Sequence, residues 1–378
     1  MASEAAAAPD PGGTTDDPGL PAGPLIELPG QPPGVPWPTR GWPGGEPTAA
    51  LAQAVEAGFD PTLAETYAIV VVQGGRLVIE RYGGALPHFD GPSEPVTPET
   101  PLLSWSMAKS VLHCLLAGPV NEGRLALDRP PSGVPWSTDG APAPADDPRR
   151  SITLDQMLQM RDGIDFNEDY VDDRVSDTIA MLFGEGAGDV VAYAASRPAR
   201  HAPGAVFNYS SGTSNLVAAA LAHALGGRDK VDEHARTSLF GPTGMTSARL
   251  GLDPAGNWIA SSYAYATARD WARFGYLHLR DGWWEDRRLL PAGWVDHGRR
   301  PHSVDPTDGA VYGSHWWVID DGRGTFRAGG YAGQSVMVCP ALDAVVVRLG
   351  NTPAEAYPPL VEWRSSVLDA IAEHSRAS

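Results

Sequence analysis

Alternating apolar and polar residues predict a β-hairpin in the first quarter of the chain. Residues 66–73 (TYAIVVVQ) and 76–83 (RLVIERYG) are rich in Val, Ile and Tyr, and two glycines separate them. Glycine supplies the positive φ angles that a two-residue hairpin turn needs. A short helical pattern at 50–57 precedes the hairpin, whereas residues 1–46 are rich in Pro, Gly, Ala and Asp and lack apolar periodicity. We expect 1–46 to be an N-terminal extension, partly extended and partly disordered, that drapes over the body.

Helical periodicity dominates the middle of the chain. Residues 104–118 (SWSMAKSVLHCLLAG) predict a largely buried helix with serines near its N-terminus. The stretch 163–186 mixes acids and aromatics without a clear period, so a loop with a short helix is expected there. The other predicted helices span 153–160, 188–196, 211–225 and 266–281.

Strand patterns return in the last third of the chain, before an amphipathic helix at about 358–374. Strands from both chain ends with helices between them predict an α+β fold. Its antiparallel sheet would be built from both ends, flanked by helices, with a helical region inserted between them. The predicted strands are 313–320, 325–329, 334–340 and 344–350, and the last two read as a hairpin.

Charge and hydropathy exclude several classes of partner. The formal net charge of −18 and the pI near 4.9 disfavour binding to nucleic acid or to an anionic membrane, because both would repel the surface. No segment reaches the roughly 18 apolar residues that a membrane span needs, and the N-terminus lacks the pattern of a secretory signal. We therefore expect a cytoplasmic protein with a small-molecule substrate, and a homodimer is left open.

The strongest local signal for chemistry is the pair Ser106 and Lys109. Residues three apart on a helix share a face, so the Lys109 amine can reach the Ser106 hydroxyl. A serine hydroxyl becomes a good nucleophile when a neighbouring base takes its proton, and lysine is such a base only if burial and positive potential lower its pKa. The short pattern alone also fits a capping serine beside a solvated lysine.

The scarcity of lysine favours the catalytic interpretation. Of the 28 basic residues only Lys109 and Lys230 are lysines, and the segment around Lys109 is apolar on both sides. Arginine cannot lose its proton in a protein, so a position that needs a neutral amine must hold lysine.

Two further segments supply partners for this pair. Tyr209 lies in FNYSSG (207–212), between a Pro-Gly turn and an apolar helix, and a phenol beside a cationic lysine is expected to have a lowered pKa and to share the proton. The segment AGGYAGQ (328–334) lets a substrate approach a strand backbone whose N–H groups stabilise an oxyanion. Alternatively, Tyr209 is a packed core aromatic and 328–334 an ordinary glycine-rich hairpin.

Other catalytic signatures are missing from the sequence. No G-x-S-x-G, H-E-x-x-H or C-x-x-C occurs, and the ten histidines lack ligand-like spacing. We therefore expect neither a metal nor a cofactor.

In this order and spacing the elements resemble the penicillin-recognising serine hydrolases, in particular the class C β-lactamase-like branch. Within it the likeness is greatest to 6-aminohexanoate-dimer hydrolases (nylon-oligomer amidases) and related esterases. The resemblance covers about residues 50–375. It rests on SMAK (106–109), EGRLALD (122–128), ITLDQMLQMRDGI (152–164), PGAVFNYSS (203–211), ATARDWARFG (266–275) and GGYAGQ (329–334).

The resemblance implies a fold, two subdomains and a set of catalytic residues. Ser106 matches the acylated nucleophile, Lys109 its base partner and Tyr209 the proton shuttle, and the backbone N–H groups of Ser106 and Tyr331 match the oxyanion hole. The implied fold is an α/β sandwich with an all-helical subdomain and the active site between them. We expect residues 47–105 and 236–378 to form the sheet subdomain and 106–235 the helical one.

Departures from the family pattern bear on the substrate. Classical β-lactamases have an asparagine two residues after the tyrosine, where this chain has Ser211. They also have a Lys-Thr-Gly, where this chain has Ala328-Gly329-Gly330. The second difference weakens the case for a β-lactam as the substrate. Phe166 aligns with a substrate-contacting tyrosine of the amidases, and Tyr170 is close enough to substitute. Asp177 aligns with a residue of the amidases that faces the substrate amine. The alternative interpretation is that Asp177 is a solvated acid on the surface. The predicted substrate-binding residues are Phe166, Tyr170, Asp177 and Gly330.

These observations predict a serine hydrolase that cleaves a small ester or a linear amide through an acyl-enzyme at Ser106. One alternative is an acyltransferase that uses the same site with an alcohol or amine acceptor. A second is a non-catalytic penicillin-recognising sensor or binding module.

Overall fold

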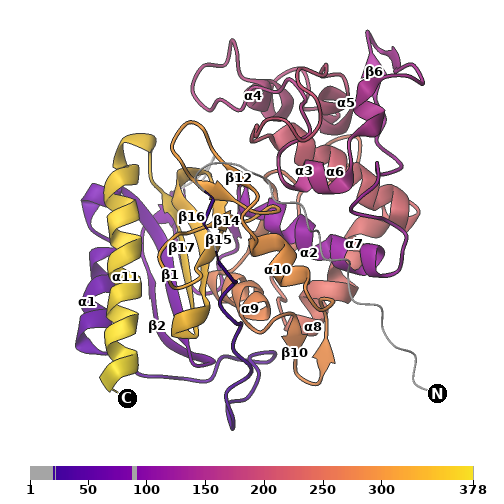
Figure 1. Cartoon of the computed structure of the whole chain (residues 1–378). Coiled ribbons are helices and arrows are strands. Elements are labelled where there is room, and N and C mark those ends of the chain that lie inside the picture. The colour runs from indigo at the N-terminus through magenta and orange to yellow at the C-terminus, as the bar shows by residue number, and fades with distance from the viewer. Residues whose placement is uncertain (1–19, 22, 87–91, 378) are drawn as a thin grey trace, which may run out of the picture.

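A computed structural model describes residues 20–21, 23–86 and 92–377 of the chain. Its main sheet has eight antiparallel strands in the order β12-β13-β14-β15-β16-β17-β1-β2 (Figure 1). Because β1 pairs with β17, the sheet joins the two ends of the chain, as the sequence predicts. The strands are β1 (Glu65–Gln73), β2 (Arg76–Tyr82), β12 (Ser303–Val304), β13 (Val311–Tyr312), β14 (Trp317–Val318), β15 (Phe326–Gly330), β16 (Gln334–Cys339) and β17 (Ala344–Asn351).

Both faces of the central strands are covered. In β1 the side chains of Val70 and Val72 belong to the larger hydrophobic core, which also contains Phe274 of helix α9 (Ala268–Leu279). Ile69 and Val71 point to the opposite face, where α1 (Ala49–Ala57) and α11 (Tyr357–Ala377) pack against each other and form a second core. Burial on both faces explains why this strand is an almost continuous apolar run.

The remaining helices lie on the α9 side of the sheet, and Figure 1 shows α3 to α6 grouped beyond its edge. Helix α2 (Met107–Asn121) is buried over most of its length and contacts both the sheet, at β15 and β16, and helix α6 (Ser211–Leu225). The boundaries of the two subdomains at 105/106 and 235/236 stay predictions. The other helices are α3 (Leu154–Leu158), α4 (Asp177–Phe183), α5 (Val190–Ala195), α7 (Lys230–Ala235), α8 (Gly241–Thr243) and α10 (Trp294–Arg299).

Two predicted elements are shorter than expected. The predicted helix 153–160 ends at Leu158, and of the predicted strand 313–320 only Trp317–Val318 (β14) forms a strand. Each missing part contains a residue in the left-handed region, Met160 (φ 58°) or His315 (φ 58°). The two segments contact each other, since the His315 N–H donates to the Leu158 carbonyl at 3.0 Å. No helical or strand period reveals a single left-handed residue.

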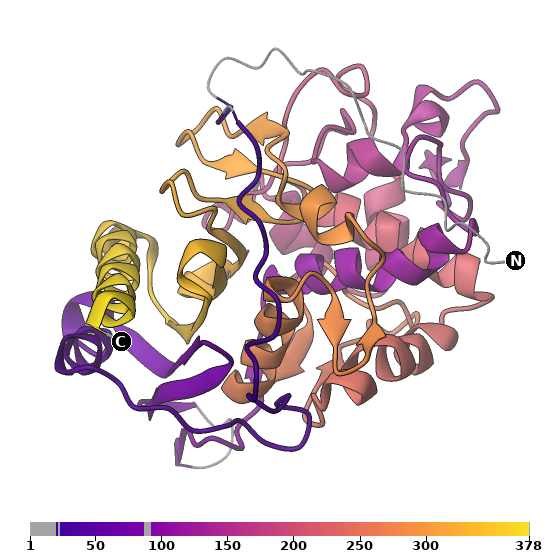
Figure 2. The same cartoon turned by 60° about the horizontal axis from the view of Figure 1, so that its bottom comes forward.

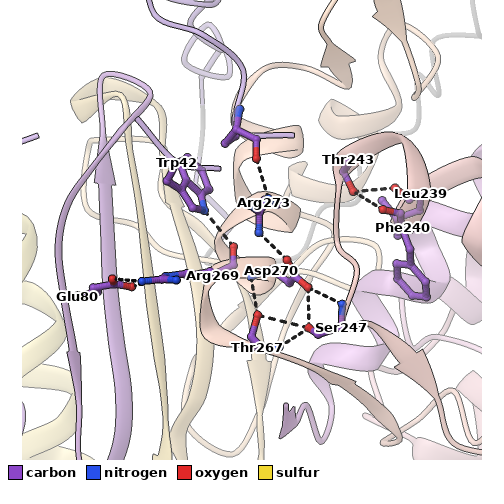
Figure 3. Close-up of polar contacts among 11 residues, drawn as sticks. Trp42, Glu80, Leu239, Phe240, Thr243, Ser247, Thr267, Arg269, Asp270 and Arg273 are labelled. Carbon is purple, nitrogen blue, oxygen red and sulfur yellow. Dashed lines mark hydrogen bonds and ion pairs between the residues drawn. The ribbon is translucent and has the colours of Figure 1, made fainter. Parts of the chain in front are cut away.

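Residues 23–46 of the N-terminal extension run along the body (Figure 2). The Arg273 side chain donates to the Pro38 carbonyl at 2.9 Å, and the Trp42 indole donates to the Arg269 carbonyl at 3.2 Å (Figure 3). Trp37 packs against Trp284 with ring centroids 5.4 Å apart. The extension therefore drapes over the body as predicted, but it is not disordered in this part. The expected disorder of 1–19 lies outside the described residues.

Within the described residues, no helix is both long and apolar enough to cross a membrane.

The start of α9 is held by a buried ion pair. Arg273 and Asp270 are bonded at 2.6 Å, with side chains 10% and 4% exposed, and Asp270 also accepts hydrogen bonds from the N–H and the hydroxyl of Ser247 (Figure 3). Removing one partner of a buried pair leaves the other charge uncompensated.

We therefore expect Asp270→Ala to lower the free energy of unfolding by about 3–5 kcal/mol, measured by chemical denaturation. The control is Glu56→Ala, which removes the exposed Glu56–Arg81 ion pair and should cost less than about 1 kcal/mol. Equal, small losses in the two variants would contradict this account of the pair.

Candidate active site

Ser106 lies at the N-cap of α2, directly after a strained residue. Trp105 has φ 46°, in the left-handed region that bulky residues rarely adopt. Its ring is held by edge-to-face packing on Tyr331 (centroids 5.5 Å apart) and Tyr263 (6.5 Å). Such strain persists where the surroundings fix the conformation, and it is concentrated at functional sites. The turn at Trp105 therefore sets the position of the Ser106 hydroxyl.

Lys109 is fully buried one helical turn further on, with 1% of its surface exposed. Its Nζ lies 3.2 Å from Ser106 Oγ, 3.2 Å from Ser211 Oγ and 3.0 Å from the Ser261 carbonyl oxygen. Burial lowers the pKa of Lys109 to about 8, against the opposing negative charge of Glu168. The predicted contact between lysine and serine and the predicted lowering of the pKa are both confirmed.

Tyr209 lies beside this pair, just before α6. The Lys109 Nζ is 4.8 Å from the centroid of the Tyr209 ring, which also stacks on Trp317 at 5.4 Å. Burial raises the pKa of Tyr209, and the negative charge of Glu168 adds to this, while its hydrogen bond to Ser106 acts in the opposite direction. The expected lowering of the Tyr209 pKa is therefore wrong: the ammonium lies over the ring face and does not offset desolvation. The phenol keeps its proton at neutral pH.

The glycine-rich segment packs against the start of α2. A Cβ at Gly330 would clash with the Ser104 carbonyl oxygen and lie 3.2 Å from the backbone nitrogen of Ser106. Only glycine therefore lets the end of β15 approach this nitrogen so closely. Tyr331 follows directly, with 43% of its surface exposed. The structure thus brings together the two backbone segments predicted to form the oxyanion hole.

Of the predicted substrate-binding residues, Tyr170 contacts both Tyr331 and Glu168. Its ring centroid is 5.1 Å from that of Tyr331, and its hydroxyl donates to Glu168 Oε1 at 2.6 Å. It is 41% exposed, so part of the side chain is open to a ligand.

Phe166 does not line the site. It is 3% exposed and belongs to the hydrophobic core, where its ring lies 2.6 Å from the position of a Cβ on Gly212 of α6. The structure does not favour its expected contact with substrate, because the ring fills the space beneath α6.

The carboxylate of Asp177 is occupied within the protein. It accepts hydrogen bonds from the Tyr193 hydroxyl at 2.7 Å, from Arg197 at 3.0 Å and from the Asn167 N–H at 2.8 Å. These bonds tie the start of α4 to the preceding loop and to α5. A substrate amine would have to compete with Arg197, so the structure does not favour the predicted amine contact, and Asp177 is not the solvated acid of the alternative either.

Sequence reasoning missed Glu168. Its carboxylate accepts hydrogen bonds from the Ser211 N–H (2.7 Å), the Ser211 hydroxyl (2.6 Å), the Thr178 hydroxyl (2.8 Å) and the Tyr170 hydroxyl. Glu168 belongs to the acid-rich loop that has no period, and its main partner is 43 residues away. No local signal separates it from the neighbouring acids.

Arg327 was missed as well. Its guanidinium lies 5.7 Å from the Trp317 ring, on the side of β15 that Gly329 leaves open. Burial lowers the pKa of Arg327, and its positive charge in turn lowers the pKa of Tyr209. Alternation along the strand puts residues 327 and 329 on one face and is the signal that could have found it.

No group of three or more His, Cys, Asp or Glu within the described ranges is arranged to hold a metal ion.

The chain is similar to several known proteins. The chain is 26% identical over 330 residues to the 6-aminohexanoate-dimer hydrolase of Paenarthrobacter ureafaciens, covering 82% of this chain and 78% of that protein. Among solved structures, a putative 6-aminohexanoate-dimer hydrolase from Bacillus anthracis superposes with a TM-score of 0.72 at 20% identity, covering 93% and 91% of the two chains. EstCE1, described as a hydrolase with promiscuous acyltransferase activity, superposes with a TM-score of 0.65 at 16% identity over 85% and 98%.

The likeness to the solved structures supports the predicted α+β fold of the β-lactamase and penicillin-binding-protein type. The family described as beta-lactamase matches residues 51–367, which is most of the chain. This protein therefore belongs to the β-lactamase family.

Proposed function

We propose that this β-lactamase-family serine hydrolase cleaves a small ester or a linear amide through an acyl-enzyme at Ser106. The observation that carries the proposal is the 3.2 Å contact between Ser106 Oγ and a lysine amine that is fully buried and has a pKa of about 8. An amine with this pKa is neutral in a minority of molecules at pH 7 and in most molecules above pH 8, and only the neutral form accepts a proton.

Two groups divide the proton transfers of acylation. Neutral Lys109 takes the Ser106 proton as Oγ attacks the substrate carbonyl carbon. Tyr209, which keeps its proton, gives it to the departing alcohol or amine and becomes a phenolate. In deacylation the phenolate takes a proton from the attacking water, and the Lys109 ammonium returns its proton to Ser106 Oγ as the acid is released.

The backbone N–H groups of Ser106 and Tyr331 are proposed to bind the carbonyl oxygen as it becomes an oxyanion. Fixed donors at this position stabilise the charge that develops in the transition state, and they need no reorganisation. The close approach that Gly330 permits supports this assignment.

The similarity to a 6-aminohexanoate-dimer hydrolase supports a linear amide substrate, because the two units of such a dimer are joined by an amide bond. The similarity to EstCE1, a hydrolase with promiscuous acyltransferase activity, supports a second candidate function in which an alcohol or amine replaces water. Product analysis with a competing acceptor separates hydrolysis from acyl transfer.

Ser106→Ala is expected to reduce turnover of a p-nitrophenyl ester by about 10³-fold or more, because the nucleophile is lost. A fluorophosphonate probe followed by intact mass should add one label to the natural protein and none to the variant. Full activity in the variant, or an unlabelled natural protein, would refute the acyl-enzyme. The second result would favour a non-catalytic sensor.

The pH dependence should follow the titration of Lys109. Because only the neutral amine accepts the Ser106 proton, kcat/KM should rise with pH through a midpoint near 8, and fall about tenfold per unit well below it. Lys109→Met should lose most of the activity together with this dependence. An unchanged pH profile in a still active Lys109→Met variant would exclude lysine as the base.

Gly330→Ala is expected to lower kcat/KM by about 10²-fold or more, because the added methyl group displaces the strand from the Ser106 N–H. Gly188→Ala is the matched control, since a Cβ there meets open space. Both variants are first compared with the natural protein by circular dichroism. Equal activities in the two variants would remove the case for an oxyanion hole at this position.

A further inference from the structure

The three polar neighbours of Lys109 Nζ constrain where its lone pair points. A neutral amine has two N–H groups and one lone pair. The Ser261 carbonyl oxygen, 3.0 Å away, can only accept a hydrogen bond. If Ser211 Oγ, 3.2 Å away, also accepts one, both N–H groups are used and the lone pair is left for the Ser106 hydroxyl at 3.2 Å.

Whether Ser211 accepts from Lys109 depends on where its own proton points. The Ser211 hydroxyl lies 2.6 Å from Glu168 Oε1, and the Ser211 N–H lies 2.7 Å from Oε2. An ionised carboxylate has no donor, so the hydroxyl must donate to it. Its lone pairs are then the groups that face Lys109.

Two further hydroxyl groups donate to the Glu168 carboxylate without contacting Ser211 or Lys109. The Thr178 hydroxyl donates to Oε2 at 2.8 Å and the Tyr170 hydroxyl to Oε1 at 2.6 Å, so four donors surround the carboxylate. Hydrogen bonds to an ionised group are the shorter and stronger ones.

We propose that Glu168 is a positioning residue of the active site: it fixes the Ser211 hydroxyl as an acceptor and so directs the lone pair of neutral Lys109 at Ser106. This inference rests on the proposed function, because it requires Lys109 to be the base. Glu168 does not touch the reacting atoms in this mechanism.

The charge of Glu168 has a second effect on the same lysine. It raises the pKa of Lys109 against the effect of burial. Two further titratable groups contact Lys109 directly, and neither carries a charge at neutral pH. Tyr209 keeps its proton, and burial lowers the pKa of His315, whose Nδ1 pairs with the Lys109 carbonyl at 3.0 Å, to about 3. Removing the Glu168 charge should therefore lower the pKa of Lys109 further.

Glu168→Gln is the direct test, because it keeps the shape of the side chain but replaces one acceptor oxygen with an NH₂ donor. The Ser211 N–H cannot turn, so the amide oxygen of the new side chain must face it and the amide NH₂ must face the Ser211 hydroxyl. That hydroxyl then has to accept from the amide NH₂ and donate toward Lys109. We expect kcat for a p-nitrophenyl ester to fall about 10- to 100-fold on the alkaline plateau, with KM changed less than about threefold.

The pH profile supplies a readout that a purely structural role would not move. In Glu168→Gln the midpoint of the rise in kcat/KM should shift to lower pH, because the charge that raises the Lys109 pKa is gone. The control is Thr178→Val, which removes another donor to the same carboxylate but leaves Ser211 in place. It should keep the midpoint and lose less than about threefold in kcat.

A double-mutant comparison isolates the series of hydrogen bonds from Glu168 through Ser211 to Lys109. Ser211→Ala should cost about as much in kcat as Glu168→Gln, and Ser211→Thr should restore most of the activity. Adding Glu168→Gln to Ser211→Ala should then have little further effect on the plateau kcat. If Glu168→Gln does not fold, Ser211→Ala still removes the hydroxyl that links Glu168 to Lys109. An unchanged kcat in Ser211→Ala would overturn the proposal.

Two failures can be told apart with the fluorophosphonate probe. If Ser106 of the natural protein is not labelled, the proposed function itself is wrong. If Ser106 is labelled, but Glu168→Gln reacts as fast and with the same midpoint, only the positioning role is overturned. An equal loss in Thr178→Val and Glu168→Gln with no shift of midpoint would likewise overturn it, because Glu168 would then act only by anchoring the loop.

Discussion

The rest of the site depends on the burial of one amine. Taking the Lys109 ammonium out of water is unfavourable, and the protein offsets the cost with two hydrogen-bond acceptors and an aromatic face rather than with a direct ion pair. A direct carboxylate partner would hold the proton on the amine. The nearest acid, Glu168, contacts Ser211 instead, so its charge acts on Lys109 through one intervening hydroxyl.

This arrangement requires four chain segments to meet around one side chain. Lys109 comes from α2, Ser211 from the start of α6, Ser261 from a buried loop, and Glu168 from the loop before α4. The antiparallel sheet adds a fifth segment, because the pairing of β15 with β16 brings Gly330 against the start of α2. The pairing of β1 with β17 joins the strands from the two ends of the chain into one sheet, and this sheet supports the site.

The regular parts of this framework could be predicted because each repeats one period over many positions. The predicted helix 211–225 coincides with α6, and the hairpin and the last two strands agree to within a residue. Ser106 and Lys109 could be found because residues three apart on a helix lie on the same face, whatever surrounds the helix. The parts that failed depend on long-range geometry: the left-handed residues Met160 and His315 have no period, and the Glu168–Ser211 bond joins positions 43 residues apart.

The same reasoning explains why the direction of one pKa was predicted correctly and that of the other was not. For Lys109, burial and the requirement for a neutral base act in the same direction, so an apolar sequence context was sufficient. For Tyr209, burial opposes ionisation, and the neighbouring cation lies over the ring rather than beside the hydroxyl. The orientation of a charge relative to a ring is a tertiary property. It makes Tyr209 a proton donor at the start of the reaction, and the lone pair of Lys109 is then the one available base for Ser106 among the described groups that surround it.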